Sequence, residues 1–310
     1  EDGLRTAIGQ LETALAIEPA FAQAWVQLAL AHAMQGMFGF APPRDANKIT
    51  HAAALRAIEA DEHFYGGHSA LGWARLWTGD IDGAHDLFRK ALRLNPSATL
   101  AMHGEADCLM FDGRMEESLS RLRELVTVSP FSVIDSFPLT AHLYMARRYE
   151  EAIVAAQAMQ ARLPGISMHR FYSRVYWQQG RFDESLEEER REFERRGDRA
   201  VSAALEAGAA ASGPTGAMRA MAEALAARAA ESYVEPFNIA GAFARAGLVD
   251  ETLCWLEKAV ENGSYEMHYI AFWPHLDFLR DDDRYRKLEK RVYGGPRAQK
   301  IRKLGSDSSR

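Results

Sequence analysis

The pattern of apolar positions in residues 65–98 predicts two helices joined by a tight turn. Gly79 and Asp80 supply the turn, and Pro96 ends the second helix. One face of the first helix carries Leu71, Gly72, Arg75 and Leu76. The second helix carries an apolar stripe at the spacing i, i+4, i+7 and i+8, formed by Ala84, Phe88, Ala91 and Leu92. This segment is therefore expected to form a helical hairpin.

The same hairpin pattern recurs along the chain at a nearly fixed period. The prolines that end second helices are spaced by 34 residues: Pro96, Pro130 and Pro164. Small residues that would let paired helices approach keep the same interval: Ala84, Ser118 and Ala152. Turn glycines stand five positions before a small residue at Gly79, Gly113 and Gly180. A fixed period in this range is typical of helical solenoids.

The residues within 71–96 also resemble a known family. They read Leu-Gly, then Gly-Asp, then A-x-x-x-F-x-x-A and Asn-Pro, and this order resembles the tetratricopeptide repeat. Weaker copies cover nearly all of residues 4–292. The resemblance implies an all-α, right-handed solenoid of about seven helical hairpins with half-repeats at both ends.

The domain organisation expected from these repeats is one superhelix over residues 1–292, followed by a disordered basic tail over 293–310. The repeats are placed near residues 20–64, 65–98, 99–132, 133–165, 166–199, 200–232 and 233–264, with a closing helix at 281–292. Residues 4–19 carry only a second-helix pattern, and the first residue is Glu1. We therefore expect further residues to precede Glu1, because a bare second helix exposes an apolar face.

Three further features resemble the C-terminal repeat regions of bacterial multidomain regulators. They are the two-proline loop Ala41–Asp45, the alanine-rich helices of 200–232, and the ending Asp277–Tyr285. In such regulators the array follows a winged-helix transcriptional activator domain, an adenylate cyclase or a Ser/Thr kinase. The resemblance implies a regulatory module for signalling or transcription, with an effector domain upstream in the same chain.

Composition narrows the classes of partner. The net charge of −6 argues against direct nucleic-acid binding, which needs a clustered basic face. The sequence has no apolar run long enough to span a membrane and no export leader. Cys108 and Cys254 are the only cysteines and lie in distant repeats, so a reducing, cytoplasmic setting is expected, with both thiols buried.

In tetratricopeptide arrays the first helices line a concave groove, and the resemblance implies which residues of this chain would do so. The expected groove residues are Trp73, Trp77, His103, Asp107, Phe111, Tyr144, Arg170, Arg174 and Trp177. Simple packing is the competing interpretation for each aromatic residue. The chaperone-tail clamp of some family members needs Lys and Asn at groove positions that here are mainly aromatic or small, which disfavours a chaperone adaptor.

Arg170 and Arg174 lie four residues apart and would share a helical face close to Trp177. Such a pair suits bidentate capture of a carboxylate or phosphate beside a stacking surface. Pairing with Asp107 or with other acids is the alternative. Residues 181–196 form a heavily charged second helix, and ion pairs such as Glu187 with Arg191 suggest a solvated outer face.

No catalytic residues, cofactor or metal site are expected. The sequence contains no G-x-S-x-G, H-E-x-x-H, phosphate loop or C-x-x-C. His103 is the only histidine placed in the groove, and a metal held by His103 and Asp107 is the one arrangement that would favour an enzyme.

The function predicted from the sequence is a non-catalytic scaffold that binds a peptide or protein segment in its groove. Two alternatives stay open. One is a small-molecule sensor for a sugar or metabolite, recognised by a deep pocket around Trp73, Trp77 and Phe111. The other is self-association as a homodimer through the N-terminal half-repeat.

Overall fold

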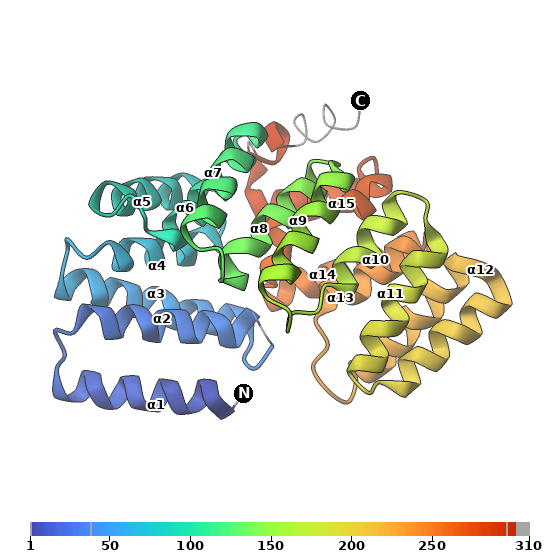
Figure 1. Cartoon of the computed structure of the whole chain (residues 1–310), viewed down its shortest axis with the longest axis horizontal. Helices are drawn as coiled ribbons and strands as arrows, with labels where there is room; N and C mark the ends of the chain where they lie inside the picture. Colours follow the sequence, from blue (N-terminus) through green and yellow to red (C-terminus); the bar gives the residue numbers. More distant parts are fainter. Residues whose placement is uncertain (1, 38, 296, 302–310) are drawn as a thin grey trace. The chain divides into compact units, whose positions relative to one another are not determined.

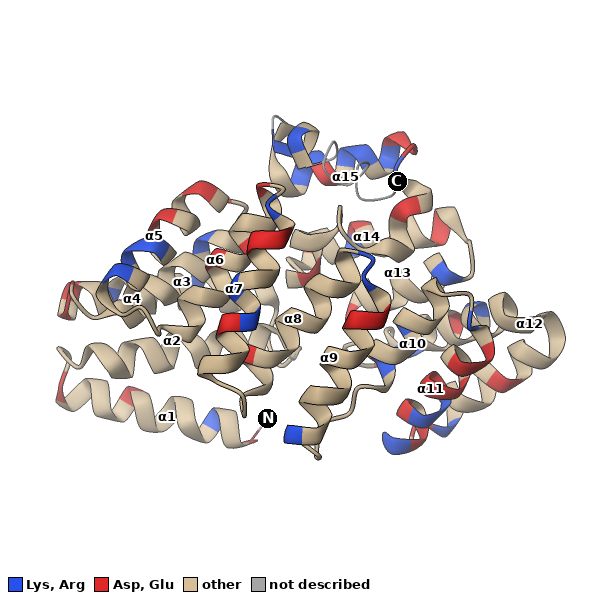
Figure 2. Ribbon diagram, turned by 45° about the horizontal axis from the view of Figure 1, so that its top comes forward, with Lys and Arg blue, Asp and Glu red and all other residues tan. Residues whose placement is uncertain are grey.

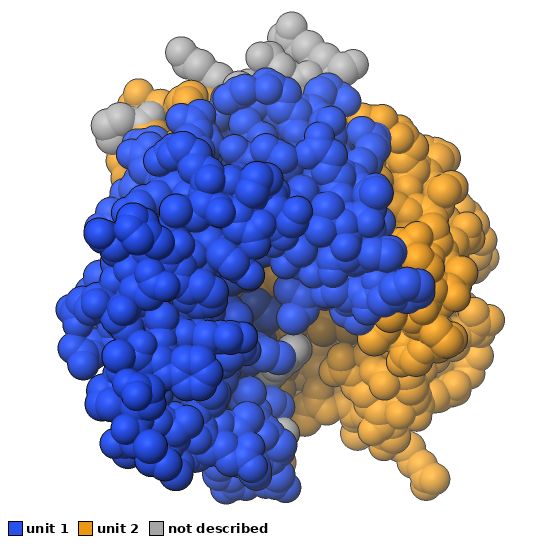
Figure 3. Space-filling model, turned by 60° about the vertical axis from the view of Figure 1, so that its left-hand side comes forward, with its two compact units in different colours: residues 1–138 blue, residues 139–310 orange. Residues whose placement is uncertain are grey.

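The computed structural model describes residues 2–37, 39–295 and 297–301, and these are arranged as helices and connecting turns without a β-strand. The predicted all-α fold class is confirmed. The chain divides into two compact units, residues 1–138 and 139–310, shown in different colours in Figure 3. The boundary falls inside helix α8 (Val133–Met145), directly after Pro138.

Unit 1 is a series of antiparallel helices, coloured blue to green in Figure 1. It contains α1 (Asp2–Ile17), α2 (Ala22–Met37), α3 (Pro43–Ala60), α4 (Tyr65–Leu76), α5 (Ile81–Leu94), α6 (Thr99–Phe111), α7 (Met115–Val128) and the start of α8. Helices α2 with α3, α4 with α5, and α6 with α7 pack as hairpins, and α1 packs on α2 as the expected half-repeat. Ile8 and Leu15 of α1 are buried with Leu28 of α2.

The close approach between α4, α5 and α6 depends on two glycines that flank one aromatic ring. Phe88 of α5 has no exposed surface. A Cβ atom added at Gly72 of α4 would lie 2.5 Å from Cε1 of Phe88, and one added at Gly104 of α6 would also collide with the ring. The absence of a side chain at both positions is therefore what lets the ring fill the space between the two helices.

Unit 2 continues the hairpin pattern. It contains the rest of α8, α9 (Tyr149–Arg162), α10 (His169–Gln178), α11 (Phe182–Arg195), α12 (Arg199–Arg228), α13 (Pro236–Arg245), α14 (Val249–Asn262), the 3-10 helices η1 (Tyr265–Tyr269) and η2 (Pro274–Leu279), and α15 (Asp283–Tyr293). Helices α10 with α11 and α13 with α14 pack as hairpins, and α8 lies beside α9 in Figures 1 and 2.

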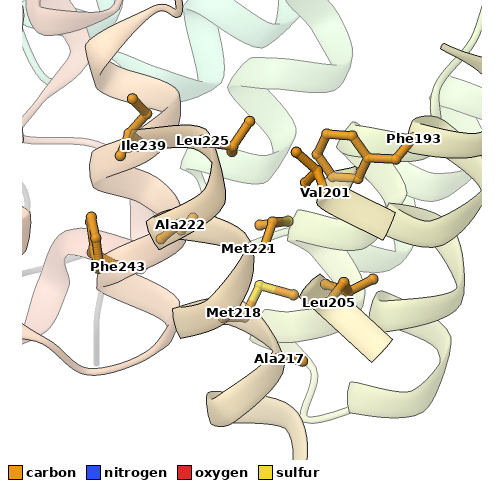
Figure 4. Packing of buried hydrophobic residues seen from close by; sticks show 11 residues of the cluster. Phe193, Val201, Leu205, Ala217, Met218, Met221, Ala222, Leu225, Ile239 and Phe243 are labelled. Atoms are coloured by element: carbon orange, nitrogen blue, oxygen red, sulfur yellow. The ribbon is translucent and has the colours of Figure 1, made fainter. Parts of the chain in front are cut away.

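Helix α12 is two helices joined by a sharp turn at Ser212 and Gly213, which have non-helical backbone angles. The halves approach at two glycines: a Cβ atom at Gly216 would lie 2.6 Å from the carbonyl oxygen of Gly208. Counted this way, the described residues contain seven hairpins, as predicted. Figure 4 shows the core formed here by apolar residues of α11, α12 and α13, including Phe193, Met218 and Phe243.

The turn inside each hairpin contains a residue with a positive φ angle. These residues are Gly39, Gly79, Gly113, Arg147, Gly180, Gly213 and Gly247. Apart from the longer first interval they recur every 33 or 34 residues. Arg147, with φ of 61°, is the exception to glycine at this position, and a side chain in the left-handed region costs about 1 kcal/mol.

The charge run of α11 is more buried than its sequence pattern predicts. Arg191 does pair with Glu187 at 2.8 Å, and Figure 2 shows how densely charged residues follow one another on this helix. Glu188, Glu189 and Glu192 are nevertheless buried. The solvated interpretation was wrong for that face because arginines from α11 itself and from other helices neutralise the carboxylates there.

Two further predictions need correction. Cys108 is buried as expected, but Cys254 of α14 is exposed. Residues 297–301, which were expected to lie in a disordered tail, are helical, with Ala298 and Ile301 buried. Residues 296 and 302–310 of that tail lie outside the described residues. Treating residues 1–292 as a single superhelix stays a prediction.

A test of the glycine packing compares Gly104→Ala with Gly9→Ala. We expect Gly104→Ala to lower the free energy of unfolding by about 1–3 kcal/mol, because its methyl group overpacks Phe88. A Cβ atom at Gly9 would meet nothing within 4 Å, so Gly9→Ala should be neutral or slightly stabilising. Chemical denaturation followed by circular dichroism measures both. Equal effects of the two substitutions would contradict this packing account.

Candidate functional site

Four of the expected groove residues in unit 1 form one cluster. The Trp73 ring lies 5.5 Å from the Trp77 ring and 4.6 Å from the His103 ring, measured between centroids. Nε1 of Trp73 donates to the carbonyl oxygen of Leu100 at 2.9 Å, which fixes the indole. His103 Nε2 lies 3.7 Å from Oδ1 of Asp107. The structure thus brings first-helix residues of α4 and α6 together.

Only part of this cluster is available to a partner. Asp107 and Phe111 have no exposed surface, and Trp73 is 5% exposed. The side chain of His103 is 17% exposed, and Trp77 is partly exposed. Trp77 and His103 therefore form the accessible edge of the cluster, while Trp73, Asp107 and Phe111 support it from inside.

In unit 2 the expected groove residue Tyr144 is covered by the chain's own C-terminal part. Tyr144 of α8 is 1% exposed. Its ring lies 5.9 Å from that of Trp273, and its hydroxyl is 3.4 Å from Nδ1 of His275. Burial raises the pKa of the Tyr144 phenol far above its ordinary value. Tyr144 is thus a packing residue in this conformation.

The same C-terminal part contacts the next first helices. We call residues 265–279, which include η1 and η2, the covering segment. Arg174 of α10 lies 5.6 Å from the Trp273 ring centroid in cation–π geometry. Phe237 of α13 lies 5.9 Å from Trp273 and 6.0 Å from His275. The covering segment therefore contacts first-helix residues of α8, α10 and α13.

Arg147 and Asp277 hold the covering segment in place. Nη2 of Arg147 donates to both carboxylate oxygens of Asp277 at 2.8 Å, and Nη1 donates to the carbonyl oxygen of Phe272 at 3.2 Å. Beyond the segment, the hydroxyl of Tyr285 in α15 donates to the carbonyl oxygen of Ile270 at 2.6 Å. The ending Asp277–Tyr285 singled out in the sequence is thus built into the fold of unit 2.

The remaining groove residues lie close to a buried ion pair. Arg245 of α13 donates to Glu189 of α11 at 2.8 Å, and both side chains are almost fully buried. The Arg245 guanidinium also lies 5.9 Å from the Trp177 ring. Arg174 donates to Oδ1 of Asn238 at 3.2 Å. Within unit 2, Arg174 therefore engages an amide and the Trp273 ring. Asp107, the acid named as a possible partner of the two arginines, lies beside His103 in unit 1 instead.

The electrostatics of this region follow from burial and charge. Burial alone would raise the pKa of the Glu189 carboxyl, but Arg245 and Arg170, together with a hydrogen bond from Ser173, lower it below its ordinary value. Burial and the like charge of Arg174 lower the pKa of the Arg170 guanidinium to about 10. Arg170 stays protonated at neutral pH, in a site that disfavours its charge.

Unit 1 contains a cavity of about 320 Å³. Its lining is strongly polar and comes from α5, α6, α7 and the turn before α7, with His85, Arg89, Glu105, Arg114, Arg121 and Glu124 among the residues. The lining residues do not include Trp73, Trp77 or Phe111. This cavity thus differs from the aromatic pocket that a sugar sensor would need.

The described residues form neither a metal-binding group nor a membrane-spanning helix. Within it, no three His, Cys, Asp or Glu side chains are grouped closely enough to hold a metal ion. Among the described helices, none combines the length and apolar character needed to cross a membrane.

The important residues that sequence reasoning missed are those of the covering segment. Trp273 and His275 lie outside every repeat, so the repeat period gives them no place in a groove. The signal available was local composition, because the sequence YEMHYIAFWPH at residues 265–275 is too aromatic for a solvated connection. Arg147 was missed because an arginine at a turn position normally signals only solvent exposure.

The tetratricopeptide repeat family model matches residues 69–132, which include most of α4, all of α5 and α6, and α7. Among curated proteins, none matches the sequence. Three similar solved structures illustrate the distance to known proteins. YrrB, a TPR protein with an unusual peptide-binding site, is 17% identical at a TM-score of 0.36 and covers 57% of this chain and 88% of its own.

The human IFIT1 dimer with PPP-AAAA is 14% identical at a TM-score of 0.40, over 84% of this chain and 69% of its own. The P58(IPK) TPR domain is 15% identical at a TM-score of 0.30, over 99% of this chain and 93% of its own. These TM-scores are too low to indicate a function for this chain. The family match confirms the tetratricopeptide resemblance for residues 69–132, and the regulator resemblance stays a prediction.

The burial of His275 makes the covering segment sensitive to acid. His275 is 7% exposed, and its Nε2 faces Gly241 without a hydrogen-bond partner among the described residues. Burial, with the charges of Arg174 and Arg245, holds the pKa of His275 well below its ordinary value. The unfolded segment therefore binds a proton near pH 6 that the docked segment does not, and docking weakens as pH falls below about 6.5.

We expect wild-type protein to lose about 1 kcal/mol of docking free energy per pH unit below about 6. Amide hydrogen exchange over residues 265–279, corrected for intrinsic rates at each pH, measures it. His275→Gln should remove most of this pH dependence, whereas His63→Gln, at an exposed position, should retain it. A pH dependence that survives His275→Gln would assign the effect to another group.

Proposed function

We propose that the chain is a non-catalytic interaction module whose first helices bind an extended or irregular segment of a protein partner. The observation that supports this most directly is the covering segment. In unit 2 the residues Tyr144, Arg174 and Phe237 contact Trp273 or His275 of a segment that is not part of any hairpin. First helices with this chemistry can therefore hold a peptide-like chain by aromatic anchors.

The proposed partner surface is the accessible edge of the cluster in unit 1. Trp77 and His103 are partly exposed there, next to the buried Trp73. Tryptophan is among the residues that most often dominate binding energy, because its large rigid side chain is desolvated at low entropic cost. These residues lie within the segment that matches the tetratricopeptide repeat model.

We further infer a regulatory setting, in which this module responds to a partner and controls an effector domain of a bacterial signalling or transcription-regulating protein in the cytoplasm. The loop Ala41–Asp45, the alanine-rich α12 and the ending Asp277–Tyr285 support this inference by resemblance. Ligand binding would act by shifting the balance between conformations of the array.

A peptide selected from a random phage-displayed library on the wild-type chain provides a probe for this surface. Trp77→Ala should weaken its binding at least tenfold, because a desolvated tryptophan anchor contributes about 2 kcal/mol or more. Fluorescence anisotropy of the labelled peptide measures the dissociation constant.

The matched control is Trp255→Ala. Trp255 lies on α14, a second helix, where Lys258 stacks over its ring at 3.7 Å, so its removal should leave peptide affinity unchanged. Equal loss in both variants, or no selected peptide that binds the free protein, would refute the proposed surface. The alternative of self-association predicts a concentration-dependent dimer. Light scattering of the unliganded chain would detect it.

A further inference from the structure

A small cavity lies among four helices of unit 2. Its volume is about 50 Å³. The polar lining comes from α10, α11, α12 and α13 and consists of Arg170, Glu189, Arg196, Arg228, Asn238 and Arg245. Four guanidinium groups and one carboxylate therefore surround a space large enough for a few water molecules or one small ion.

Three of these arginines have carboxylate partners. Arg245 pairs with Glu189 at 2.8 Å, and Nε of Arg196 donates to Glu192 at 2.6 Å. Arg228 pairs with Asp198 at the start of α12. Glu192 also pairs with Arg195 at 3.0 Å, so two arginines share its charge.

Arg170 is the exception. It is partly buried, and within the described part of the chain its guanidinium has no ion pair within 4.0 Å, although the charge of Glu189 attracts it. Oε1 of Glu189 accepts from Arg245 and from Ser173, both at 2.8 Å. Arg174, one turn along α10, adds a second positive charge rather than a counter-charge.

Glu266 of η1 is the other acid that faces these arginines. Burial raises the pKa of its carboxyl, and the opposing attraction of Arg174 and Arg170 does not offset this. Among the described residues, no ion pair within 4.0 Å joins Glu266 to either arginine. The four arginines that line the cavity therefore face a single lining carboxylate, that of Glu189.

A partly buried guanidinium without an ion-pair partner lowers the stability of the fold, and an anion bound beside it offsets this loss. A planar guanidinium offers two parallel N–H donors that match the spacing of oxygens in a carboxylate or phosphate. We propose that this cavity binds a small oxyanion, a phosphate or carboxylate group, with Arg170 as its principal ligand. The site lies in unit 2, whereas the proposed partner surface lies in unit 1, and the two proposals are independent.

The test is thermal unfolding of the whole chain at rising concentrations of inorganic phosphate, with sodium chloride adjusted to keep ionic strength constant. Wild-type protein should show a saturable rise in Tm, of roughly 2 °C or more once phosphate exceeds its Kd tenfold. Arg170→Gln should abolish the rise. Arg219→Gln, which removes a 63% exposed arginine side chain from α12, should retain it.

The Tm without phosphate separates a role of Arg170 in anion binding from a role in the stability of the fold. Without phosphate, Arg170→Gln should melt at or above the wild-type Tm, because it removes an unbalanced charge. Arg170→Lys, which keeps the charge but loses the paired donors, should bind phosphate about tenfold more weakly. A lower Tm for Arg170→Gln without phosphate would instead indicate a structural role for Arg170 and overturn the proposal.

O-phospho-L-serine, titrated in parallel, distinguishes the source of the anion. A response to phosphate alone assigns the cavity to a free ion, and a response to both assigns it to a phosphate group carried on a larger molecule. An unsaturable rise of equal size in wild type and Arg170→Gln would show an adventitious ion only and refute the site.

Discussion

The fold of this chain depends on one backbone constraint, the left-handed turn between the two helices of each hairpin. A positive φ angle at this position lets the second helix return along the first within a few residues. Glycine adopts this conformation without steric penalty. The turn position is occupied by Gly79, Gly113 and Gly180 in the part of the chain where the repeat is most regular. The regular interval between these turns keeps Ala84, Ser118 and Ser185, all fully buried, at equivalent helix contacts.

Arg147 is the one residue other than glycine, among those described, that has a positive φ angle in a hairpin turn. Its backbone accepts the left-handed conformation, and its side chain reaches the carboxylate of Asp277 and the carbonyl oxygen of Phe272. The backbone penalty of about 1 kcal/mol is offset by these largely buried hydrogen bonds to a charged group. A repeat position has thus been adapted to fix the covering segment, which in turn buries Trp273 and His275 on the first helices.

The local parts of this structure were predictable from the sequence, and the non-local parts were not. Helix period, turn glycines and closing prolines placed the hairpins because each signal acts over a few residues. The burial of Glu189 depends on Arg245, more than 50 residues away, and that of Tyr144 depends on Trp273 and His275. Spacing along one helix carries no information about such partners.

The central claim is that residues 265–279 lie on the first helices of unit 2 and are fixed there by the contact of Asp277 with Arg147, in the turn between α8 and α9. A double-mutant cycle with Arg147→Gly and Asp277→Asn tests this most directly, with the opening free energy of residues 265–279 measured by native-state hydrogen exchange. We predict that each substitution lowers this free energy and that the double variant loses about 1 kcal/mol less than the sum of the two. Additive losses, or a segment that already exchanges freely in the wild-type chain, would contradict the claim.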